Sequence, residues 1–217
     1  MKNILIAGVS GNIGSYIYKA LKNKFNLSGI SRSNHDRKEN IYKLDLTDLN
    51  EVKKFTENCL IFDALIFFVA LAHEKGKNKN YKEFNRLNVT TLKNLLNCLE
   101  KNEKLPASII YASTISVYGQ KMYSDFYYED SKKDPKTPYA KTKLEAENFL
   151  LKNFKKTSTI LRISPVYSKK FFLNIDRRTK LWKFYYKIGS GEKGMSLCHM
   201  KNIRKVLNAV LNGTVPV

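Results

Sequence analysis

Ile4-Leu5-Ile6-Ala7-Gly8-Val9-Ser10-Gly11-Asn12-Ile13-Gly14 is the stretch that decides the fold of this chain of 217 residues. An apolar run leads into three regularly spaced glycines, and an amphipathic pattern follows over Tyr16–Phe25. This order predicts a strand, a tight turn and a helix whose N-terminus carries partial positive charge. The first glycine permits the turn, the second lets backbone N–H groups approach an anion, and the third lets the helix pack close to the strand. The stretch predicts a dinucleotide site that includes Gly8, Gly11, Asn12, Ile13 and Gly14.

Strand and helix patterns alternate along the rest of the chain. Strands are expected at Leu27–Ser31, Ile41–Leu44, Ala64–Ala70, Ser108–Ala112 and Thr159–Ile163. Helices are expected at Leu49–Asn58 (with Thr47 or Asp48 as N-cap), Tyr81–Lys101 and Tyr139–Lys155, and loops at His73–Asn80 and Gln120–Pro138. This alternation, with the nearly continuous apolar run of a strand covered on both faces, predicts an α/β fold with a doubly wound parallel sheet. At this length one domain spanning 1–217 is expected.

The charge is strongly basic, with 39 Lys and Arg against 19 Asp and Glu and a formal net charge of +20. Such a charge suits nucleic acid or an anionic membrane surface. The basic residues are spread along the whole chain, however, and a diffuse basic surface also suits phosphorylated or nucleotide-linked substrates. We therefore expect no dedicated nucleic-acid site.

Cysteine and histidine positions favour a reduced, cytoplasmic protein without a metal site. Cys59, Cys98 and Cys198 are far apart and odd in number, and the three histidines are equally scattered. The longest apolar run, Cys59–Ala72, is interrupted by Asp63 and is too short to cross a bilayer. The N-terminal run is shorter than the core of a signal peptide.

A second motif, Tyr139-Ala140-Lys141-Thr142-Lys143, places a phenol and an ammonium on one helix face. A nearby ammonium lowers the pKa of a tyrosine, so that it can exchange a proton with a carbonyl or an alcohol. Tyr18/Lys22 and Tyr128/Lys132 have the same spacing. Only Tyr139 opens a helix directly after a proline and follows a hydroxyl-rich strand end, so the context favours Tyr139 over the other two tyrosines. The alternative for Tyr139 and Lys143 is a solvated helix face.

Together these motifs resemble the NAD-dependent epimerase/dehydratase family of extended short-chain dehydrogenases/reductases, which mostly act on nucleotide sugars. The resemblance covers residues 1 to about 167 in the expected order and, more loosely, residues 195–211, which resemble a later strand and helix of the family. It rests on the glycine turn, Asp45-Leu46-Thr47-Asp48, Asn88-Val89, Ala112-Ser113-Thr114-Ile115-Ser116-Val117-Tyr118-Gly119, Pro138-Tyr139 with Lys143, and Leu161-Arg162 with Val166-Tyr167. The resemblance implies a Rossmann fold, here with a reduced C-terminal substrate-binding portion at 165–200.

The resemblance also implies roles for individual residues. Tyr139 would be the acid/base, and Lys143 would hold the nicotinamide ribose and tune Tyr139. Thr114 would hydrogen-bond the reacting oxygen, with Ser113 as the less favoured choice; the alternative for Thr114 is a strand-end hydroxyl that caps its own backbone. Cofactor contacts are further expected from Asp45, Leu46, Val69 and Ala70.

The end of the second strand bears on the choice of cofactor. An acidic residue there would accept the 2′-hydroxyl of NAD, whereas this chain has Ser31-Arg32-Ser33. Arg32 and the neighbouring hydroxyls suit a 2′-phosphate, so NADP(H) is favoured and NAD(H) is the alternative. The alternative that Arg32 is simply a surface residue after a strand stays open.

We therefore expect an NADP(H)-dependent reductase of a keto group on a nucleotide-linked deoxysugar. A dehydratase is disfavoured, because Thr114 is followed by Ile115 and Ser116 where the family's dehydratases carry Asp-Glu. The alternatives are an NAD-dependent nucleotide-sugar epimerase and a non-catalytic cofactor-sensing or RNA-associated relative.

Partners are expected to be a nucleotide sugar and a second copy of the chain. Lys169, Lys170, Arg177, Arg178 and Lys180 are candidates for contacting a substrate diphosphate, or else form a solvated basic loop. The resemblance implies a homodimer built from the helices Tyr81–Lys101 and Tyr139–Lys155, for which Leu95→Glu is the expected test.

Overall fold

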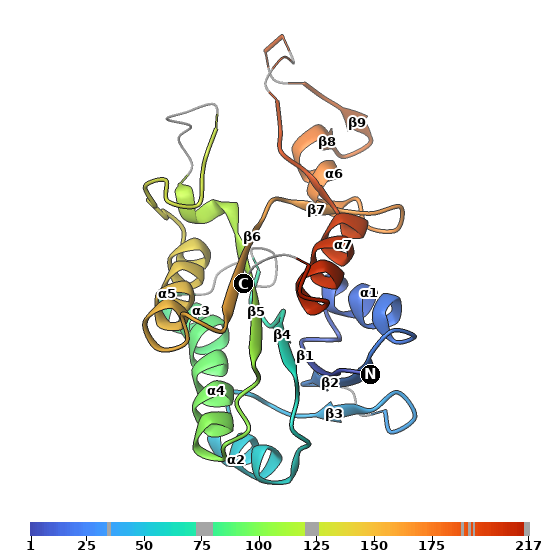
Figure 1. Cartoon of the computed structure of the whole chain (residues 1–217). Coiled ribbons are helices and arrows are strands. Elements are labelled where there is room, and N and C mark those ends of the chain that lie inside the picture. Colours follow the sequence, from blue (N-terminus) through green and yellow to red (C-terminus); the bar gives the residue numbers. More distant parts are fainter. Residues whose placement is uncertain are drawn as a thin grey trace.

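Six parallel strands form the central sheet, in the order β3-β2-β1-β4-β5-β6 across it (Figure 1). The computed structural model describes residues 1–33, 36–72, 80–119, 126–187, 189–190, 192 and 194–214. The strands of the sheet are β1 (Asn3–Ala7), β2 (Asn26–Ser31), β3 (Ile41–Lys43), β4 (Ala64–Phe67), β5 (Ser108–Thr114) and β6 (Ser158–Ile163). This is the doubly wound order of a Rossmann fold, so the expected fold class is confirmed.

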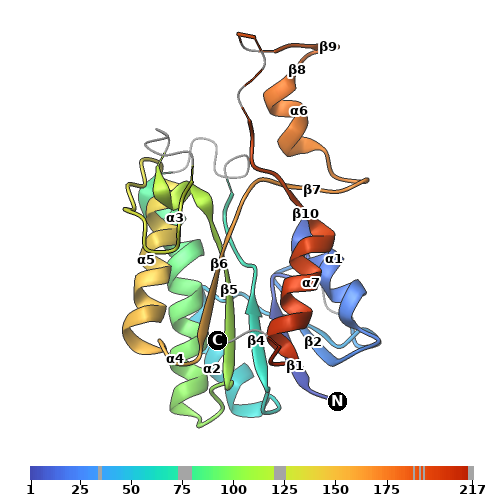
Figure 2. The same cartoon turned by 45° about the horizontal axis from the view of Figure 1, so that its top comes forward.

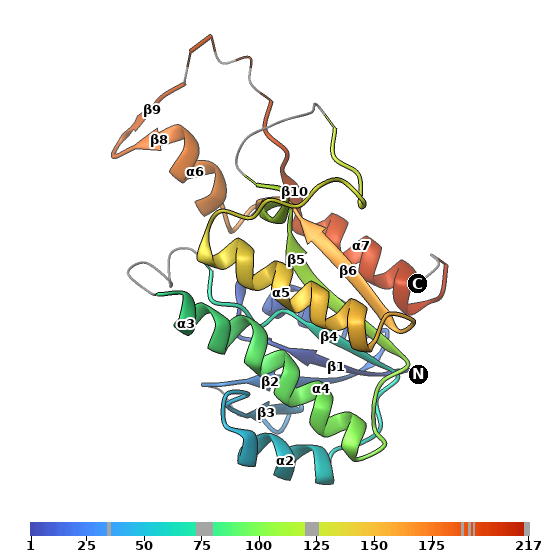
Figure 3. The same ribbon diagram turned by 90° about the vertical axis from the view of Figure 1, so that its left-hand side faces the viewer.

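Helices cover both faces of the sheet because successive side chains of each buried strand point to opposite sides (Figure 3). Leu5 and Ala7 belong to a core shared with α2 (Leu49–Asn58), α4 (Thr91–Lys101) and α5 (Pro138–Asn153). Ile4 and Ile6 belong to the opposite core, shared with α1 (Asn12–Leu21) and α7 (Met200–Leu211). All four side chains are fully buried, as the continuous apolar run predicts.

Two element boundaries differ from the expected ones at places that bear on function. The first helix begins at Asn12, directly after Gly11, whereas the amphipathic pattern indicated a start near Tyr16. The fourth strand ends at Phe67 and does not continue to Ala70. Its partner β1 ends at Ala7, where the glycine turn begins, and residues 68–72 follow a separate path along the carboxyl edge of the sheet.

The long helix expected over Tyr81–Lys101 is present in three sections. α3 (Tyr81–Asn85) passes into a π-helical segment η1 (Arg86–Thr90), which leads into α4. π-helical segments are rare. They occur mostly as single turns that hold one extra residue inside an α-helix, often at functional sites. Nothing in the apolar periodicity indicated it. Leu95 on α4 is fully buried in the core, so Leu95→Glu would damage the fold and cannot test the expected homodimer.

The last quarter of the chain, after β6, projects beyond the carboxyl edge of the sheet and then returns to the sheet with α7 (Figure 2). It contains β7 (Val166–Tyr167), α6 (Leu173–Thr179), β8 (Lys180–Leu181), β9 (Phe184–Tyr185), β10 (Cys198–His199) and α7. β10 pairs with β7 in parallel, and β8 pairs with β9 in a small hairpin. The expected strand and helix over 195–211 thus correspond to β10 and α7. No helix in the described ranges is long and apolar enough to cross a bilayer.

The remaining expected elements agree in kind, with small shifts of their ends. Asp48, and not Thr47, caps α2, because its side chain accepts hydrogen bonds from the N–H groups of Asn50 and Glu51. β5 extends two residues further than expected, to Thr114, and passes into a 3₁₀ turn η2 (Ile115–Tyr118). The expected loop at 73–80 lies outside the described residues except for Asn80, and the loop at 120–138 is described from 126 on.

Candidate active site

A cavity of about 360 Å³ lies at the carboxyl edge of the sheet, between the turn after β1 and the segment after β4. This is the point at which the strand order reverses, and ligands of open α/β sheets bind there. Nine of the residues expected from the sequence line it: Gly8, Gly11, Asn12, Ile13, Gly14, Ala70, Thr114, Tyr139 and Lys143. The structure therefore brings the two motifs, 125 residues apart at their nearest members, Gly14 and Tyr139, to one site.

The glycine turn leaves no room for side chains. Gly8 has φ +90°, and a Cβ built on it would lie 3.0 Å from the backbone nitrogen of Val69. A Cβ on Gly14 would lie only 2.1 Å from the carbonyl oxygen of Gly8. α1 starts immediately after the turn, and no side chain in the described part of the chain caps it. Its first N–H groups can therefore receive an anion, which is the arrangement a dinucleotide pyrophosphate requires.

Thr114 and Tyr139 meet at the carboxyl end of β5. The two side chains are hydrogen-bonded, and this bond lowers the pKa of Tyr139. Burial raises it more strongly, so that the pKa of Tyr139 stands at about 12. Thr114 Oγ1 also accepts from the N–H of Ser116 at 3.2 Å, so its expected alternative as a backbone cap is realised together with its contact to Tyr139.

Lys143 is 1% exposed, so the reading as a solvated helix face is wrong for this side chain. Its Nζ lies 4.1 Å from the ring centroid of Tyr111, a cation–π distance. Burial lowers the pKa of Lys143 to about 7, with the Glu147 carboxylate acting in the opposite direction. The expected lowering of the Tyr139 pKa by Lys143 is not found, because desolvation dominates the pKa of both groups.

The residues expected around the adenosine lie outside the cavity. Ser31 is buried in β2, and Arg32 is exposed directly after it. Burial raises the pKa of Asp45, but hydrogen bonds from Thr47 and the charge of Arg32 outweigh this and hold the pKa below its usual value. The Arg32 guanidinium thus shares its surroundings with a carboxylate, which weakens the case for a dedicated 2′-phosphate site. Leu46 and Val69 also do not line the cavity.

The far wall of the cavity comes from the segment expected to bind substrate. Asn174, Arg177 and Arg178 of α6 line it, together with Phe171 and Leu173. Burial and the neighbouring Arg177 both lower the pKa of Arg178, so two guanidinium groups face one region. The basic residues of this segment were expected as candidates, whereas Asn174 was not, since a lone amide in a short helix gives no signal in a sequence.

Asn88 connects the wall of the cavity with α5. From the π-helical segment its fully buried amide accepts from the N–H of Leu71 at 2.6 Å and donates to Thr142 Oγ1 at 3.0 Å. The Thr142 hydroxyl lies 3.0 Å from the carbonyl oxygen of Tyr139. The sequence identified Asn88 only as part of a motif; the structure gives it a positioning role for two sides of the cavity.

We expect Asn88→Ala to destabilise the protein by about 1–3 kcal/mol, because the buried Leu71 N–H would lose its acceptor. It should also weaken dinucleotide binding, since residues 70–72 would lose their anchor. Thermal unfolding and a fluorescence titration with NADH measure the two effects. Asn97→Ala, at an exposed position on α4, is the matched control and should change neither. Wild-type stability in Asn88→Ala would contradict the assigned role.

No group of three or more His, Cys, Asp or Glu side chains that could hold a metal ion is found in the described residues, which leave out His35 and His73. The three cysteines are free.

Comparison with known proteins agrees with this geometry. The model of the NAD dependent epimerase/dehydratase family matches residues 4–210. Among solved structures, UDP-glucose 4-epimerase from Thermotoga maritima with UDP-glucose has a TM-score of 0.78 at 18% identity, covering 96% of this chain and 73% of that one. UDP-glucuronic acid 4-epimerase from Bacillus cereus, in complex with UDP-glucuronic acid and NAD, has a TM-score of 0.75 at 22% identity, with the same coverage.

A third neighbour is the UDP-Glc/GlcNAc 4-epimerase from Campylobacter jejuni, with a TM-score of 0.76 at 23% identity, covering 98% of this chain and 74% of that one. At these identities the neighbours establish the fold. This chain spans about three quarters of the length of each of them.

Proposed function

The chain belongs to the NAD dependent epimerase/dehydratase family, and from this membership we propose that it is an NAD(P)-dependent epimerase of a nucleotide-linked sugar. One observation carries the proposal: Thr114, Tyr139 and Lys143 line the same cavity as an uncapped helix N-terminus and a glycine turn without room for a Cβ. The turn and the helix end fit a dinucleotide pyrophosphate, and the three side chains fit proton exchange with an alcohol.

An epimerase is preferred here to the reductase expected from the sequence. The solved structures that the fold resembles include 4-epimerases of UDP-glucose and UDP-glucuronic acid, one of them holding NAD. The feature that favoured NADP(H), Arg32, shares its surroundings with Asp45 and does not line the cavity. NADP(H)-dependent reduction of a keto sugar remains the second candidate, because Arg32 is exposed at the end of β2.

The proposed chemistry divides between the two walls of the cavity. When bound, the nicotinamide would supply the two-electron oxidation and reduction of the sugar carbon. Tyr139 would take the proton of the sugar hydroxyl and later return it, with Thr114 orienting the same oxygen. Lys143, which lines the cavity together with Tyr139, would hold the nicotinamide ribose. Arg177 and Arg178 would hold the diphosphate of the substrate.

The experiment begins with the nucleotide that the purified protein retains, identified after acid release. We then expect NADH to bind in a fluorescence titration, and UDP-glucose, UDP-glucuronic acid or UDP-N-acetylglucosamine to give the 4-epimer by NMR without net change in nicotinamide absorbance. Substrate conversion that consumes NADPH, with binding that weakens in Arg32→Ala and not in the exposed Arg37→Ala, would instead establish the reductase. Binding without turnover of either kind would indicate a non-catalytic relative.

A further inference from the structure

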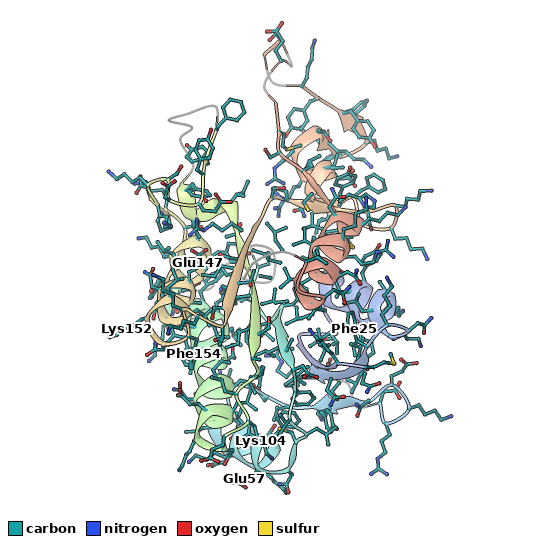
Figure 4. All side chains as sticks on the ribbon, viewed as in Figure 1. Phe25, Glu57, Lys104, Glu147, Lys152 and Phe154 are labelled. Atoms are coloured by element: carbon teal, nitrogen blue, oxygen red, sulfur yellow. The ribbon has the colours of Figure 1, made fainter. Side chains whose placement is uncertain are left out.

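An ion pair joins Glu147 of α5, which Figure 4 labels, to Arg162 of β6. Arg162 Nη2 donates to Glu147 Oε2 at 2.8 Å, and Nε donates to the same oxygen at 3.1 Å. The Glu147 side chain is fully buried, and that of Arg162 is 13% exposed. Such a pair is costly to desolvate and contributes little to stability by itself, so its presence calls for an explanation other than stability.

The pair is the centre of a wider hydrogen-bond network. Ser113 Oγ donates to Glu147 Oε1. Arg162 Nη1 donates to the Tyr118 hydroxyl at 2.7 Å and to the carbonyl oxygen of Glu129 at 2.6 Å. The network therefore joins β5, η2, α5, β6 and the loop after 126, which are the elements around the proposed catalytic residues.

Glu147 also follows the two proposed catalytic residues of α5 along the same helix face. Tyr139, Lys143 and Glu147 are spaced by four residues, which puts all three on one helix face. On β5, the Ser113 that Glu147 holds is the neighbour of Thr114. A single carboxylate thus touches the strand end that carries one proposed catalytic group and shares the helix face that carries the other two.

Glu147 lies one helical turn beyond Lys143 on α5, although its ion pair among the described residues is with Arg162 and not with Lys143. The ring of Tyr111 from β5 contacts the Lys143 ammonium and Tyr139 lines the same cavity, while Arg162 from β6 and Tyr118 from η2 contact Glu147 and each other. Glu147 is the one charged group in the described chain that acts on the pKa of Lys143, which it raises. A buried ammonium without a nearby carboxylate would be strongly disfavoured.

We propose that Glu147, held by Arg162, is a positioning residue that fixes the Ser113–Thr114 strand end against the Tyr139–Lys143 face of α5 and, from one turn further along that face, favours the charged form of Lys143. The proposal rests on the proposed function in so far as Tyr139 and Lys143 are taken as the catalytic pair. Its physical content, the coupling of Glu147 to Lys143, does not depend on any substrate or cofactor.

The test is a pH titration of the Lys143 side chain by NMR in lysine-labelled protein, with the signal assigned by its loss in Lys143→Arg. The wild-type midpoint should lie near 7. In Glu147→Gln, which keeps the shape and removes the charge, the ammonium loses the carboxylate charge that favours it, so the midpoint should fall by at least about one unit, a tenfold smaller charged fraction above it. The pH profile of turnover should shift in the same direction.

Glu145→Gln is the matched control. It removes the same charge from the same helix at a surface site, where Glu145 accepts from the Tyr81 hydroxyl and lies 3.6 Å from Lys93 Nζ. The Lys143 midpoint should not move. An unchanged midpoint in folded Glu147→Gln, or an equal shift in Glu145→Gln, would overturn the proposal.

If Glu147→Gln alone does not fold, the double variant Glu147→Gln/Arg162→Gln replaces it, because removing both partners leaves no unpaired buried charge. Its Lys143 midpoint should also lie below that of the wild type, and an unchanged midpoint would overturn the proposal equally. Failure to bind NADH or NADPH would refute the proposed function and leave the titration result standing, so the two failures are distinguishable.

Discussion

Gly14→Ala is expected to abolish dinucleotide binding, with an affinity loss of at least about 100-fold, or close to 3 kcal/mol. The added Cβ would lie 2.1 Å from the carbonyl oxygen of Gly8, 2.9 Å from its carbonyl carbon and 3.1 Å from the Cα of Val9. All three are backbone atoms, so no flexible side chain can move to make room. The helix must shift away from the turn, which displaces the N–H groups that would receive the pyrophosphate.

The backbone of the turn has little freedom to relax. The Gly8 carbonyl oxygen already accepts the N–H of Gly11 at 3.1 Å, and the Gly8 N–H is bound to the carbonyl oxygen of Ile30 at 2.9 Å. We therefore expect a loss of about 1–3 kcal/mol in unfolding free energy as well, as for an overpacked core. NADH fluorescence and thermal unfolding measure the two losses separately.

Gly194→Ala is the control for this substitution, because among the described residues no heavy atom other than those of its chain neighbours lies within 4 Å of the added Cβ. It should leave both stability and NADH binding unchanged. Wild-type affinity in Gly14→Ala would mean that the turn is not the dinucleotide site.

Tyr139→Phe is expected to reduce turnover by about 10²–10⁴-fold while leaving cofactor affinity nearly unchanged. The substitution removes only the hydroxyl group, which is hydrogen-bonded to Thr114 at the cavity. Because the Tyr139 pKa of about 12 reflects burial, the phenyl ring should be well tolerated by the fold. The measurement is the rate of epimer formation at saturating nucleotide sugar, beside an NADH titration.

Tyr128→Phe supplies the matched comparison. Tyr128 has the same spacing to a lysine, Lys132, but it is 66% exposed and lies in a loop outside the cavity. Its substitution should not change turnover. Equal losses in both variants would show that the place of Tyr139 in the cavity does not account for its effect on turnover.

The sequence predicted the architecture well, because buried parallel strands and the glycine turn leave strong local patterns. Ile4–Ala7 and Ala64–Phe67 are continuous apolar runs, and a run of that kind needs cover on both faces. The residues of the first turn of α1 were predicted as a site from the glycines alone, although the amphipathic pattern placed the start of the helix four residues too late.

Features that depend on tertiary contacts could not be predicted in this way. Glu147 is separated from Arg162 by the last residues of α5, a turn and the start of β6, and a glutamate on a helix of mixed polarity is ordinarily a solvent-exposed residue. The stacking of Lys143 against Tyr111 likewise requires the α5–β5 contact to be known. Burial lowers the pKa of Lys143 and raises the pKa of Tyr139, which is why reasoning from the Tyr–Lys spacing alone gave the wrong direction for Tyr139.

The π-helical segment at Arg86–Thr90 makes this part of the chain sensitive to its residue count. The π-helical turn accommodates one residue more than an α-helical turn, so deleting one residue here would let an ordinary α-helix form while α3 and α4 kept their orientation and the side chains inside the segment changed direction. The leucines of α4 would keep their places in the core, and Asn88 would turn away from Leu71 and Thr142. A one-residue deletion, harmless by helix propensity, would thus separate the wall of the cavity from the helix that carries Tyr139.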